Sequence, residues 1–540
     1  MPHVNTERRG GTTPPREGRR IVAGSATGLL AVGAALGAAE LVAGMTGSVS
    51  PVVAVGDVVV DATPAFLMEW AIALFGTADK VVLVTGITAV LFGAGAVLGV
   101  IALRRPVLGY AGLAVFALAG LAAVLLRRAD DPWAAAPVVA GAAAGALALA
   151  LLSRSARTAR RPGREGRPQA PADAETAPAQ VGSDRGPGRR GFVLTATGVL
   201  VGSATAGALG RWLPDALGGA GARSALALPA AAEPLPALPS GTDLGVPGLA
   251  PFSTPNADFY RIDTALTVPR LDSTRWRLRV HGMVDEPFEI DMDELLALPL
   301  VEADITMTCV SNQVGGDLVG NSRWLGFPLA DLLRRAGVQS GADQILSTSD
   351  DGWTCGTPTE VVMDGRDALL AVGMGGEPLP HEHGYPARMV VPGLYGFVSA
   401  TKWVTDIKLT RFADERAYWA RRDWAVRAPI KVMSRVDVPA PLGRVPSGDT
   451  VLAGVAWAQH RGVAAVEVSV DDGDWWEAEL AQVPGIDTWV QWVAETALEP
   501  GPHTVRVRAT DATGRTQTSE RTEPIPDGAT GWHSIRFTAE

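Results

Sequence analysis

Long apolar runs dominate the first 212 residues and restrict what this part of the chain can fold into. A helix needs about 20 apolar residues to cross the hydrocarbon core of a membrane. Four runs meet this requirement clearly, and a fifth is rich in Gly, Thr and Ser but contains no charge; the five runs are residues 21–44, 81–103, 107–126, 134–152 and 192–210. The sequence therefore predicts an N-terminal bundle of about five transmembrane helices.

Two smaller features interrupt this pattern. Residues 64–75 form an apolar segment between the first two predicted spans, and it is too short to cross. We interpret it as an interfacial or re-entrant helix. Glu40 falls inside the first span, where a carboxylate often marks function. A position near the membrane boundary, facing other helices, explains Glu40 with fewer assumptions.

Positive charge is distributed unevenly around the predicted spans. The segments on one side carry 16 arginines and those on the other side carry three cations. The arginine-rich segments are 1–20, 104–105 and 153–190, and the three cations are Lys80, Arg127 and Arg128. Because cytoplasmic loops carry the excess of Lys and Arg, we predict a multi-pass protein of the cell membrane, with a cytoplasmic N-terminus and an extracytoplasmic C-terminal part.

The 153–190 linker is rich in Arg, Pro, Ala and Gly, a composition typical of disorder. It ends in Arg189 and Arg190, followed by Gly-Phe-Val-Leu at the start of the fifth predicted span. This pattern resembles a twin-arginine export signal, although a pair of stop-transfer arginines explains it equally well. A cofactor inserted in the cytoplasm would favour the export signal, because such a domain must cross the membrane folded.

The C-terminal part has the composition of a soluble, acidic protein. Residues 1–212 carry 20 Lys and Arg against 13 Asp and Glu, whereas the remainder carries 27 against 44. This balance argues against nucleic acid as a partner. Residues 213–250 are low-complexity Ala, Pro, Leu and Gly sequence, which we interpret as a tether between the membrane region (1–212) and the soluble domains.

Two soluble domains follow the predicted tether. In residues 251–428, a strand pattern at 276–282 and helix patterns at 292–298 and 326–336 indicate an α+β domain. Residues 429–540 contain alternating runs separated by Gly, Pro and Asp turns, which predicts an all-β, immunoglobulin-like sandwich of seven strands. The alternating runs are 432–438, 450–457, 464–470, 488–494 and 503–509.

Cys309 is one of only 2 cysteines, the other being Cys355. Two cysteines are too few for a disulfide scaffold and match no zinc spacing. Cys309 ends an alternating apolar run, so it lies where a predicted strand meets a loop. A thiol in this position could be a nucleophile, a metal ligand or a buried residue without chemistry, and the neighbouring residues alone favour the last. In the same way, His381, His383 and Arg388 could bind a phosphate or be structural.

Five short motifs, in this order and spacing, resemble the sulfite oxidase family. They are Phe-Tyr-Arg at 259–261, Thr-Cys-Val-Ser-Asn at 308–312, Arg-Trp-Leu-Gly-Phe-Pro-Leu at 323–329, His-Gly-Tyr-Pro-Ala-Arg at 383–388 with Val-Pro-Gly at 391–393, and Thr-Lys-Trp at 401–403. The resemblance covers about residues 251–428, and the all-β region resembles the dimerisation domain of that family, which implies a possible homodimer.

The resemblance implies a molybdenum–molybdopterin cofactor and oxygen-atom transfer, with the Cys309 thiolate as the protein ligand to the metal and Arg261 as a second catalytic residue. A soft thiolate suits this metal, and a phosphate suits a guanidinium and a lysine. The residues that it implies for cofactor binding are Phe259, Tyr260, Arg261, Asp263, Cys309, Asp350, His383, Arg388, Ala400, Thr401 and Lys402.

The implied substrate pocket departs from the family pattern. Arg261 matches one arginine of that pocket, but Val314 occupies the place of a second and Trp424 replaces the active-site tyrosine. Residues 525–528 occupy the stretch that supplies a third arginine in the family. Each missing cation removes charge-assisted hydrogen bonds of about 1.5–3 kcal/mol. We therefore expect a substrate less charged than sulfite, such as a sulfoxide, either a small molecule or an oxidised protein.

None of the seven histidines lies in a predicted span, and the chain has no Cys-x-x-Cys-His motif. We therefore expect no haem, and an external electron-transfer partner, either a cytochrome or a membrane haem protein. Two other functions are weaker. One is a non-catalytic, membrane-tethered binding module with a degenerate cofactor fold, against which Cys309, His383, Arg388 and Lys402 argue together. The other is a transporter, against which the lack of paired intramembrane charges argues.

Overall fold

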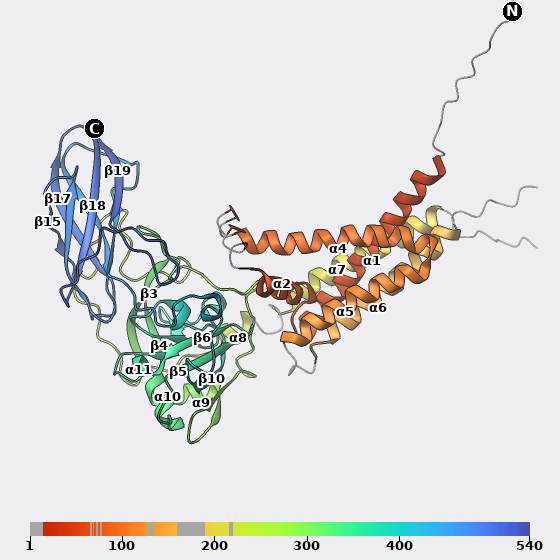
Figure 1. Cartoon of the computed structure of the whole chain (residues 1–540), viewed down its shortest axis with the longest axis horizontal. Helices are drawn as coiled ribbons and strands as arrows, with labels where there is room; N and C mark the ends of the chain where they lie inside the picture. The colour runs from red at the N-terminus through yellow and green to blue at the C-terminus, as the bar shows by residue number, and fades with distance from the viewer. Residues whose placement is uncertain are drawn as a thin grey trace, which may run out of the picture. The chain divides into compact units, whose positions relative to one another are not determined.

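The computed structural model describes residues 15–64, 67, 70, 71, 74, 75, 78–127, 133–158, 189–214 and 220–540. The chain divides into two compact units, Met1–Leu217 and Gly218–Glu540 (Figure 1). Half of the predicted 64–75 helix lies outside the described residues, as do Arg128 and residues 159–188 of the predicted linker. Residues 153–158 belong to a helix instead of to that linker.

The first unit contains five helices that are long and apolar enough to cross a membrane, as the sequence predicts. They are α1 (Pro15–Thr46), α4 (Asp79–Arg104), α5 (Pro106–Arg127), α6 (Ala136–Thr158) and α7 (Arg189–Pro214). A shorter helix, α2 (Pro51–Ala62), contacts α5 and was not predicted, because Asp57 and Asp61 interrupt its apolar run. Glu40 on α1 accepts a hydrogen bond from Ser50, which lies directly before α2.

Helix α1 contacts α4, α6 and α7 and is the centre of the bundle (Figure 1). Its contact with α4 is close because glycines face each other. A Cβ atom on Gly99 would lie 2.2 Å from the carbonyl oxygen of Gly24, and one on Gly28 would lie 1.8 Å from that of Gly95. Without a hydrophobic driving force between helices in lipid, such close backbone packing is what holds them together.

Replacing Gly99 with Ile should destabilise the bundle by about 1–3 kcal/mol, because the added side chain forces α1 and α4 apart. The loss can be measured as a lower midpoint of thermal unfolding of the helices in detergent. Gly93→Ile on the same helix is the matched control, since no atom lies within 4 Å of a Cβ at Gly93. Equal effects of the two substitutions would show that this helix contact is not limiting.

The α+β domain of the second unit contains two sheets with the strand orders β3-β4-β7-β8, to which β9 is added through β7, and β2-β1-β10-β5-β6. The strands are β1 (Arg277–Gly282), β2 (Phe288–Asp291), β3 (Val301–Thr308), β4 (Val319–Pro328), β5 (Gln344–Ser349), β6 (Thr354–Pro358), β7 (Leu369–Met374), β8 (Glu377–Pro378), β9 (Arg388–Val390) and β10 (Val404–Thr410). The helices are α9 (Met292–Leu296), α10 (Leu329–Ala336), α11 (Thr359–Val362) and the 3-10 turns η3 (His381–His383), η4 (Gly396–Val398) and η5 (Ala420–Arg422).

The helix predicted at 326–336 begins three residues later than expected. Strand β4 continues to Pro328, which pairs with Leu369 of β7, so residues 326–328 extend the sheet. From Leu329 onward the predicted apolar face is present, since Leu329, Leu332 and Leu333 are all buried. The strand predicted at 276–282 corresponds to β1.

The C-terminal domain is all-β, as predicted, and contains nine strands instead of seven. The strand orders are β11-β13-β17-β16 and β12-β19-β18-β14-β15. The strands are β11 (Met433–Val438), β12 (Arg444–Val445), β13 (Gly448–Trp457), β14 (Val463–Val470), β15 (Trp476–Glu477), β16 (Glu479–Leu480), β17 (Val490–Leu498), β18 (Gly501–Asp511) and β19 (His533–Ala539). All five predicted strands are present. The immunoglobulin-like assignment stays a prediction.

Residues 226–250, which follow the short helix α8 (Ala220–Ala225), form what we call the strap. The strap has little regular structure, but its backbone is bonded to both soluble domains. Ala232 N donates to Leu300 O at 2.8 Å, and further on Leu244 N donates to the side chain of Gln491 at 2.7 Å. Part of the predicted 213–250 tether is therefore an integral segment of the second unit.

Candidate functional site

Cys309 lies directly after β3, at the start of the loop 309–318 that leads into β4. Its N–H donates to Leu318 O at 2.9 Å, and its carbonyl accepts from Asn312 N at 3.1 Å. The side chain of Asn312 accepts a hydrogen bond from Leu318 N at 2.9 Å. These bonds close the loop on itself, so the thiol, which is 8% exposed, has a fixed place at the end of a strand. The predicted junction between a strand and a loop is confirmed.

The surroundings of Cys309 bear on the three roles that the sequence left open. Burial raises the pKa of the Cys309 thiol, and hydrogen bonds from Ser311 and the charge of Lys402 only partly oppose this shift. A thiol with a raised pKa is a poor free nucleophile, because the thiolate is the reactive form. A bound metal ion would hold the sulfur ionised. The site therefore suits a metal ligand better than a nucleophile.

Cys355 on β6 is fully buried and differs in its neighbours. Burial raises its pKa to about 11, against hydrogen bonds from Thr357, Thr401, Ala400 and Ser347. Hydrogen-bonding groups therefore surround this thiol, and we assign it no chemistry.

Arg388, Lys402 and Arg261 form a cluster of cations that the predicted cofactor residues bring together. The Nη1 atom of Arg388 donates to His383 O at 3.0 Å, and its Nε atom donates to Met389 O at 3.4 Å. Lys402 Nζ lies 3.1 Å from the carboxylate of Asp263 and 3.0 Å from the carbonyl of Glu382. Arg261 pairs with the same Asp263 carboxylate at 2.9 Å. Two cations thus share one carboxylate, while Arg388 is held by main-chain carbonyls.

Lys402 and Arg388 of this cluster are buried, and burial disfavours their charged forms. Burial lowers the pKa of Lys402 to about 8, with the charge of Arg388 adding to the effect and Asp263 opposing it. Burial also lowers the pKa of Arg388 to about 10. The pKa of His383 falls to about 4 through burial and the charges of Arg388 and Lys402, so this histidine is neutral near neutral pH. Buried cations of this kind are stabilised by an anion, and a phosphate fits them.

Aromatic rings form one side of this cluster. Phe259 stacks on Tyr260 with ring centroids 5.2 Å apart and meets Trp324 and His383 edge-on. The guanidinium of Arg388 lies 5.2 Å from the ring centre of Trp324. Burial and the field of Cys309 raise the pKa of Tyr260, and Arg388 opposes this, so Tyr260 is near both the thiol and the cations. The ring of Phe259 would be 2.8 Å from a Cβ atom on Gly320 of β4.

The Ala400-Thr401-Lys402 turn packs against the same cluster. Thr401 Oγ1 lies 2.7 Å from Ser347 Oγ, and Thr401 O accepts from Met389 N at 2.9 Å. Asp350 N donates to Trp403 O at 2.8 Å, which places Asp350 beside the turn. Gly384 has φ +109°, and a Cβ atom there would lie 3.0 Å from Arg388 Cβ and 3.1 Å from Lys402 Cα. Only glycine lets the His383 segment approach both cations this closely.

The predicted pocket residues Val314 and Trp424 lie in a different environment from Arg261. Val314 is buried in the large apolar core, and Trp424 packs against that core. Trp424 stacks on Trp419 at 4.2 Å and meets Phe397 edge-on at 5.3 Å. Sequence reasoning missed Phe397 and Trp419, which no periodicity marks. It also missed Tyr395, which is buried in the same core. Burial raises the pKa of Tyr395 to about 12, and the charge of Cys309 contributes to this shift.

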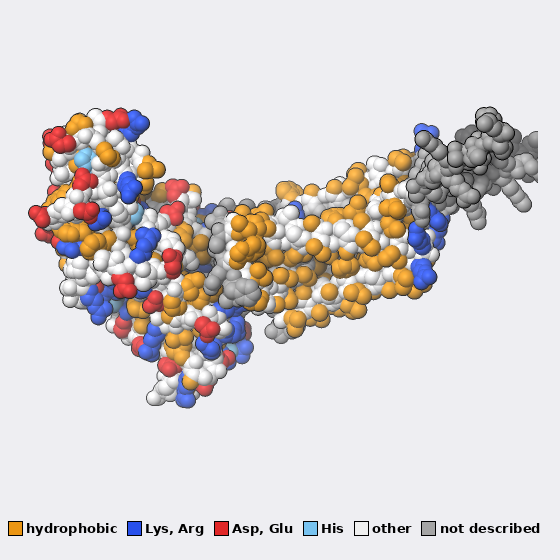
Figure 2. Space-filling view, turned by 45° about the horizontal axis from the view of Figure 1, so that its top comes forward, with side chains coloured by type: hydrophobic (Ala, Val, Ile, Leu, Met, Phe, Trp, Pro, Cys, Tyr) orange, Lys and Arg blue, Asp and Glu red, His pale blue; other side chains and the backbone are white. Residues whose placement is uncertain are grey.

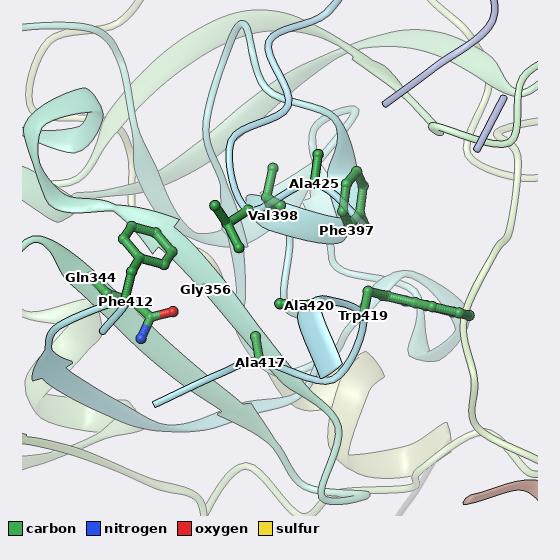
Figure 3. Close-up of a pocket in the computed structure, with 10 residues that line it drawn as sticks. Gln344, Gly356, Phe397, Val398, Phe412, Ala417, Trp419, Ala420 and Ala425 are labelled. Carbon is green, nitrogen blue, oxygen red and sulfur yellow. The ribbon is translucent and has the colours of Figure 1, made fainter. Parts of the chain in front are cut away.

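An apolar pocket adjoins this aromatic group (Figure 3). The pocket is small and has room for about one water molecule. Phe397 and Trp419 lie on one side of it, and Phe412 and Gln344 on the other (Figure 3). Neither Arg261 nor Val314 lines this pocket. Its walls offer apolar surface and no cation.

Comparison with known proteins connects this region to a described family. Residues 265–419 match the family described as oxidoreductase molybdopterin binding domain. The chain is 33% identical over 156 residues to the uncharacterized oxidoreductase YuiH of Bacillus subtilis (strain 168), covering 29% of this chain and 75% of that protein. It is 29% identical over 272 residues to the mitochondrial sulfite oxidase of Rattus norvegicus, covering 42% of this chain and 49% of the rat protein.

The chain thus spans about half the length of the mammalian relatives that it matches. Among solved structures, it is similar to the sulfane dehydrogenase SoxCD from Paracoccus pantotrophus, with 22% sequence identity and a TM-score of 0.47. That alignment covers 54% of this chain and 84% of the other.

Replacing Lys402 with Met should change how stability depends on pH in protein prepared without cofactor. The pKa of Lys402 is about 8 in the folded chain, against an ordinary 10.5. Between these values the unfolded chain binds a proton that the folded chain has released, so the Lys402 contribution to stability increases with pH. Lys402→Met should lack this increase, which is on the order of 3 kcal/mol. The increase can be measured by thermal unfolding at pH values below the folded pKa and above the unfolded pKa of Lys402.

Lys408→Met is the control for this substitution. Lys408 is partly exposed and pairs with Glu415 at 2.9 Å, so its removal should cost at most about 1 kcal/mol and leave the Lys402 contribution between the two pKa values in place. If Lys402→Met and Lys408→Met had the same pH dependence of stability, the conclusion that burial disfavours the charged form of Lys402 would be wrong.

Proposed function

The chain belongs to the sulfite oxidase family of molybdopterin oxidoreductases, and we propose on this basis that it is a membrane-anchored enzyme that transfers an oxygen atom on the outer face of the cell membrane. The observation that carries the proposal is the pairing of a buried thiol with a raised pKa and a buried excess of cations beside it. A metal ion satisfies the thiol and a phosphate satisfies the cations, and a molybdenum–pterin cofactor supplies both.

The residues of the cluster divide the binding of this cofactor among them. Cys309 provides the soft thiolate for the metal. Arg388 and Lys402 bind the phosphate, with the planar guanidinium offering two parallel donors. Phe259 and Tyr260 would provide a flat apolar wall, and Ala400, in the same apolar cluster as Phe259, would add to it. When bound, the cofactor supplies two-electron oxygen-atom transfer.

His383 serves as a neutral hydrogen-bonding residue in this proposal. Its pKa of about 4 keeps the ring uncharged, so it does not add to the repulsion between Arg388 and Lys402. Its Nε2 atom lies 3.1 Å from the carbonyl oxygen of Asn256 and therefore donates to it. That bond leaves Nδ1 as an acceptor, which suits an N–H group of the pterin.

We propose that the substrate is less charged than sulfite, and that a sulfoxide group fits best. Arg261 is the pocket cation that matches the family, and its charge is already engaged by Asp263 at 2.9 Å. Val314 offers no charge, and Trp424 belongs to an aromatic group with Trp419 and Phe397. An anion would lose its hydration there without gaining charged partners, whereas a neutral sulfoxide with an apolar body would lose less.

The distribution of charge on the helix bundle supports a proposal for the orientation of the protein in the membrane. Lys and Arg side chains gather at one end of it (Figure 2). That end contains the termini of α4 and α6, where Arg157 donates to Ala102 O at 3.3 Å. We place this end, with the N-terminus, in the cytoplasm. Arg189 and Arg190 at the start of α7 would then act as a twin-arginine export signal for a folded, cofactor-loaded domain.

Because the seven histidines of the chain all lie outside the predicted spans, the bundle has no imidazole pair for a haem. We propose that an external cytochrome or membrane haem protein exchanges electrons with the enzyme. The all-β domain is the proposed site of a homodimer contact.

Cys309→Ser should abolish turnover and remove the Mo(V) EPR signal, because a serine hydroxyl cannot replace the thiolate as a soft ligand. Circular dichroism and thermal unfolding should show that the fold is retained. Cys355→Ser is the matched control and should keep both activity and signal, since Cys355 is held by hydroxyl and main-chain groups. Activity in the Cys309→Ser protein, or native protein without molybdenum and pterin, would contradict the proposal.

Titration of the loaded enzyme should separate the two substrate classes. Methionine sulfoxide should oxidise the reduced molybdenum centre, whereas sulfite should reduce the oxidised centre only weakly, because the pocket lacks the cations that bind an oxyanion. The Mo EPR signal follows both reactions. Rapid reduction by low concentrations of sulfite would overturn the proposed substrate while leaving the proposed cofactor intact.

A further inference from the structure

Strand β3, which leads to Cys309, is the edge strand of its sheet. It pairs with β4 on one side, and its other edge carries N–H and C=O groups that need partners. The strap covers the start of this edge, where Ala232 N donates to Leu300 O at 2.8 Å and Glu233 pairs with Val301. The C-terminal domain covers its end, where Thr306 N donates to Asp487 O at 2.9 Å.

Gln459 of the C-terminal domain contacts the last residues of β3 most directly. It follows β13 and is 0% exposed. Its Nε2 atom donates to the carbonyl of Thr306 at 3.0 Å and to the hydroxyl of Thr308 at 3.1 Å. Thr308 immediately precedes Cys309. One buried amide therefore fixes both the main chain and a side chain at the point where the strand becomes the ligand loop.

The surrounding polar groups form a buried network that makes Gln459 difficult to replace by water. Thr306 Oγ1 accepts from Trp489 N at 2.7 Å and donates to Asn321 Oδ1 at 2.9 Å. Asn321, on the neighbouring strand β4, donates to Phe252 O at 3.1 Å. Each group has its partner in a neighbouring segment, so a shift of β3 would break several buried hydrogen bonds at once.

The far side of the loop 309–318 is also held by the C-terminal domain. Arg435 Nη1 donates to Gly316 O at 2.9 Å, and its guanidinium is held in place by Asp437. The ring of His533 occupies the space that a Cβ atom on Gly315 would take, with its nearest atoms 2.2 Å from that position. Gly315 has φ +79°, so glycine is required there for both conformation and space.

We propose that the C-terminal domain positions the metal-ligand loop, and that Gln459 is the positioning residue for the Cys309 thiolate. This inference rests on the proposed function, in which Cys309 binds the metal. The loop's own hydrogen bonds fix its shape, while Gln459 and Arg435 fix its place relative to the cation cluster. A metal ligand must be held within about 0.5 Å of its working geometry, and groups behind the ligands commonly supply that restraint.

The test compares Gln459→Leu with Gln491→Leu in the full-length chain, purified in detergent without cofactor. Gln491 is also fully buried in the C-terminal domain, and it also makes two hydrogen bonds to another segment, with Leu244 N and Ala250 O, both at 2.7 Å. Those bonds hold the strap and not the ligand loop. The readouts are the alkylation rate of Cys309, followed by peptide mass spectrometry, and hydrogen exchange of the amides in 309–318.

Gln459→Leu should raise both rates by about tenfold, as expected for the loss of a buried hydrogen bond, whereas Gln491→Leu should leave both unchanged. Gln459→Glu is the second variant, because it keeps the side-chain length and turns the donor toward Thr306 O into an acceptor. It should shift both rates in the same direction. If both Gln459 variants behave like Gln491→Leu, the positioning role is overturned.

The cofactor-loaded proteins separate this inference from the proposed function. If Cys309 is the ligand, Gln459→Leu should retain molybdenum but shift or broaden the Mo(V) EPR signal, and Gln491→Leu should not. If Cys309→Ser leaves the native signal unchanged, the proposed function fails, whatever the alkylation rates show. An unaltered signal in Gln459→Leu, together with a lost signal in Cys309→Ser, would overturn the positioning role alone.

Discussion

The burial of Arg388 and Lys402 side by side is the constraint on which the rest of the molybdopterin-binding domain depends. Both cations are removed from water, the charge of Arg388 lowers the pKa of Lys402, and both charges lower the pKa of His383. The two cations lie together because several elements converge at this point. Strand β9 supplies Arg388 and the turn after η4 supplies Lys402, while Gly384 lets η3 approach both. The segment before β1 adds Arg261 and Asp263, and the carboxylate of Asp263 balances only part of the positive charge.

A different physical principle holds the helix bundle of the first unit together. There the close approach of glycines brings the helix backbones into contact, as is typical of helices that pack within a membrane. Gly24 and Gly28 on α1 fit against Gly95 and Gly99 on α4. Added volume at these glycines is therefore the hazard for the helix bundle, whereas the second unit is sensitive both to added volume, as at Gly315, and to loss of a buried polar partner.

The sequence predicted those parts of the structure that depend on local patterns. The five apolar runs correspond to five long helices, and the alternating runs correspond to β1 and to the strands of the C-terminal domain. Helix α2 escaped prediction because Asp57 and Asp61 break its apolar run. The structure of the strap was not predicted because backbone hydrogen bonds hold it in place, and these need no periodic pattern of side chains. The start of α10 was misplaced because pairing with β7 extends β4 through Pro328.

The site was predictable only in part, for a similar reason. Cys309, His383, Arg388 and Lys402 could be connected through the spacing of several motifs, but no one of them indicates its chemistry alone. Gln459 lies 151 residues from Thr308, and only the packing of two domains makes them neighbours. The raised pKa of Cys309 likewise arises from burial, which a sequence pattern shows poorly.

The strap also changes where the folded part of the second unit begins. Composition assigns residues 213–250 to a spacer, yet from Ala232 onward this segment completes the edge of β3, and Arg223 just before it pairs with Glu377 at 2.9 Å. A soluble form of the protein released by proteolysis or truncation must therefore be cut ahead of the strap. A cut at the compositional boundary near residue 250 would leave the start of the β3 edge, at Leu300 and Val301, without its partners, and exposed edges recruit other chains.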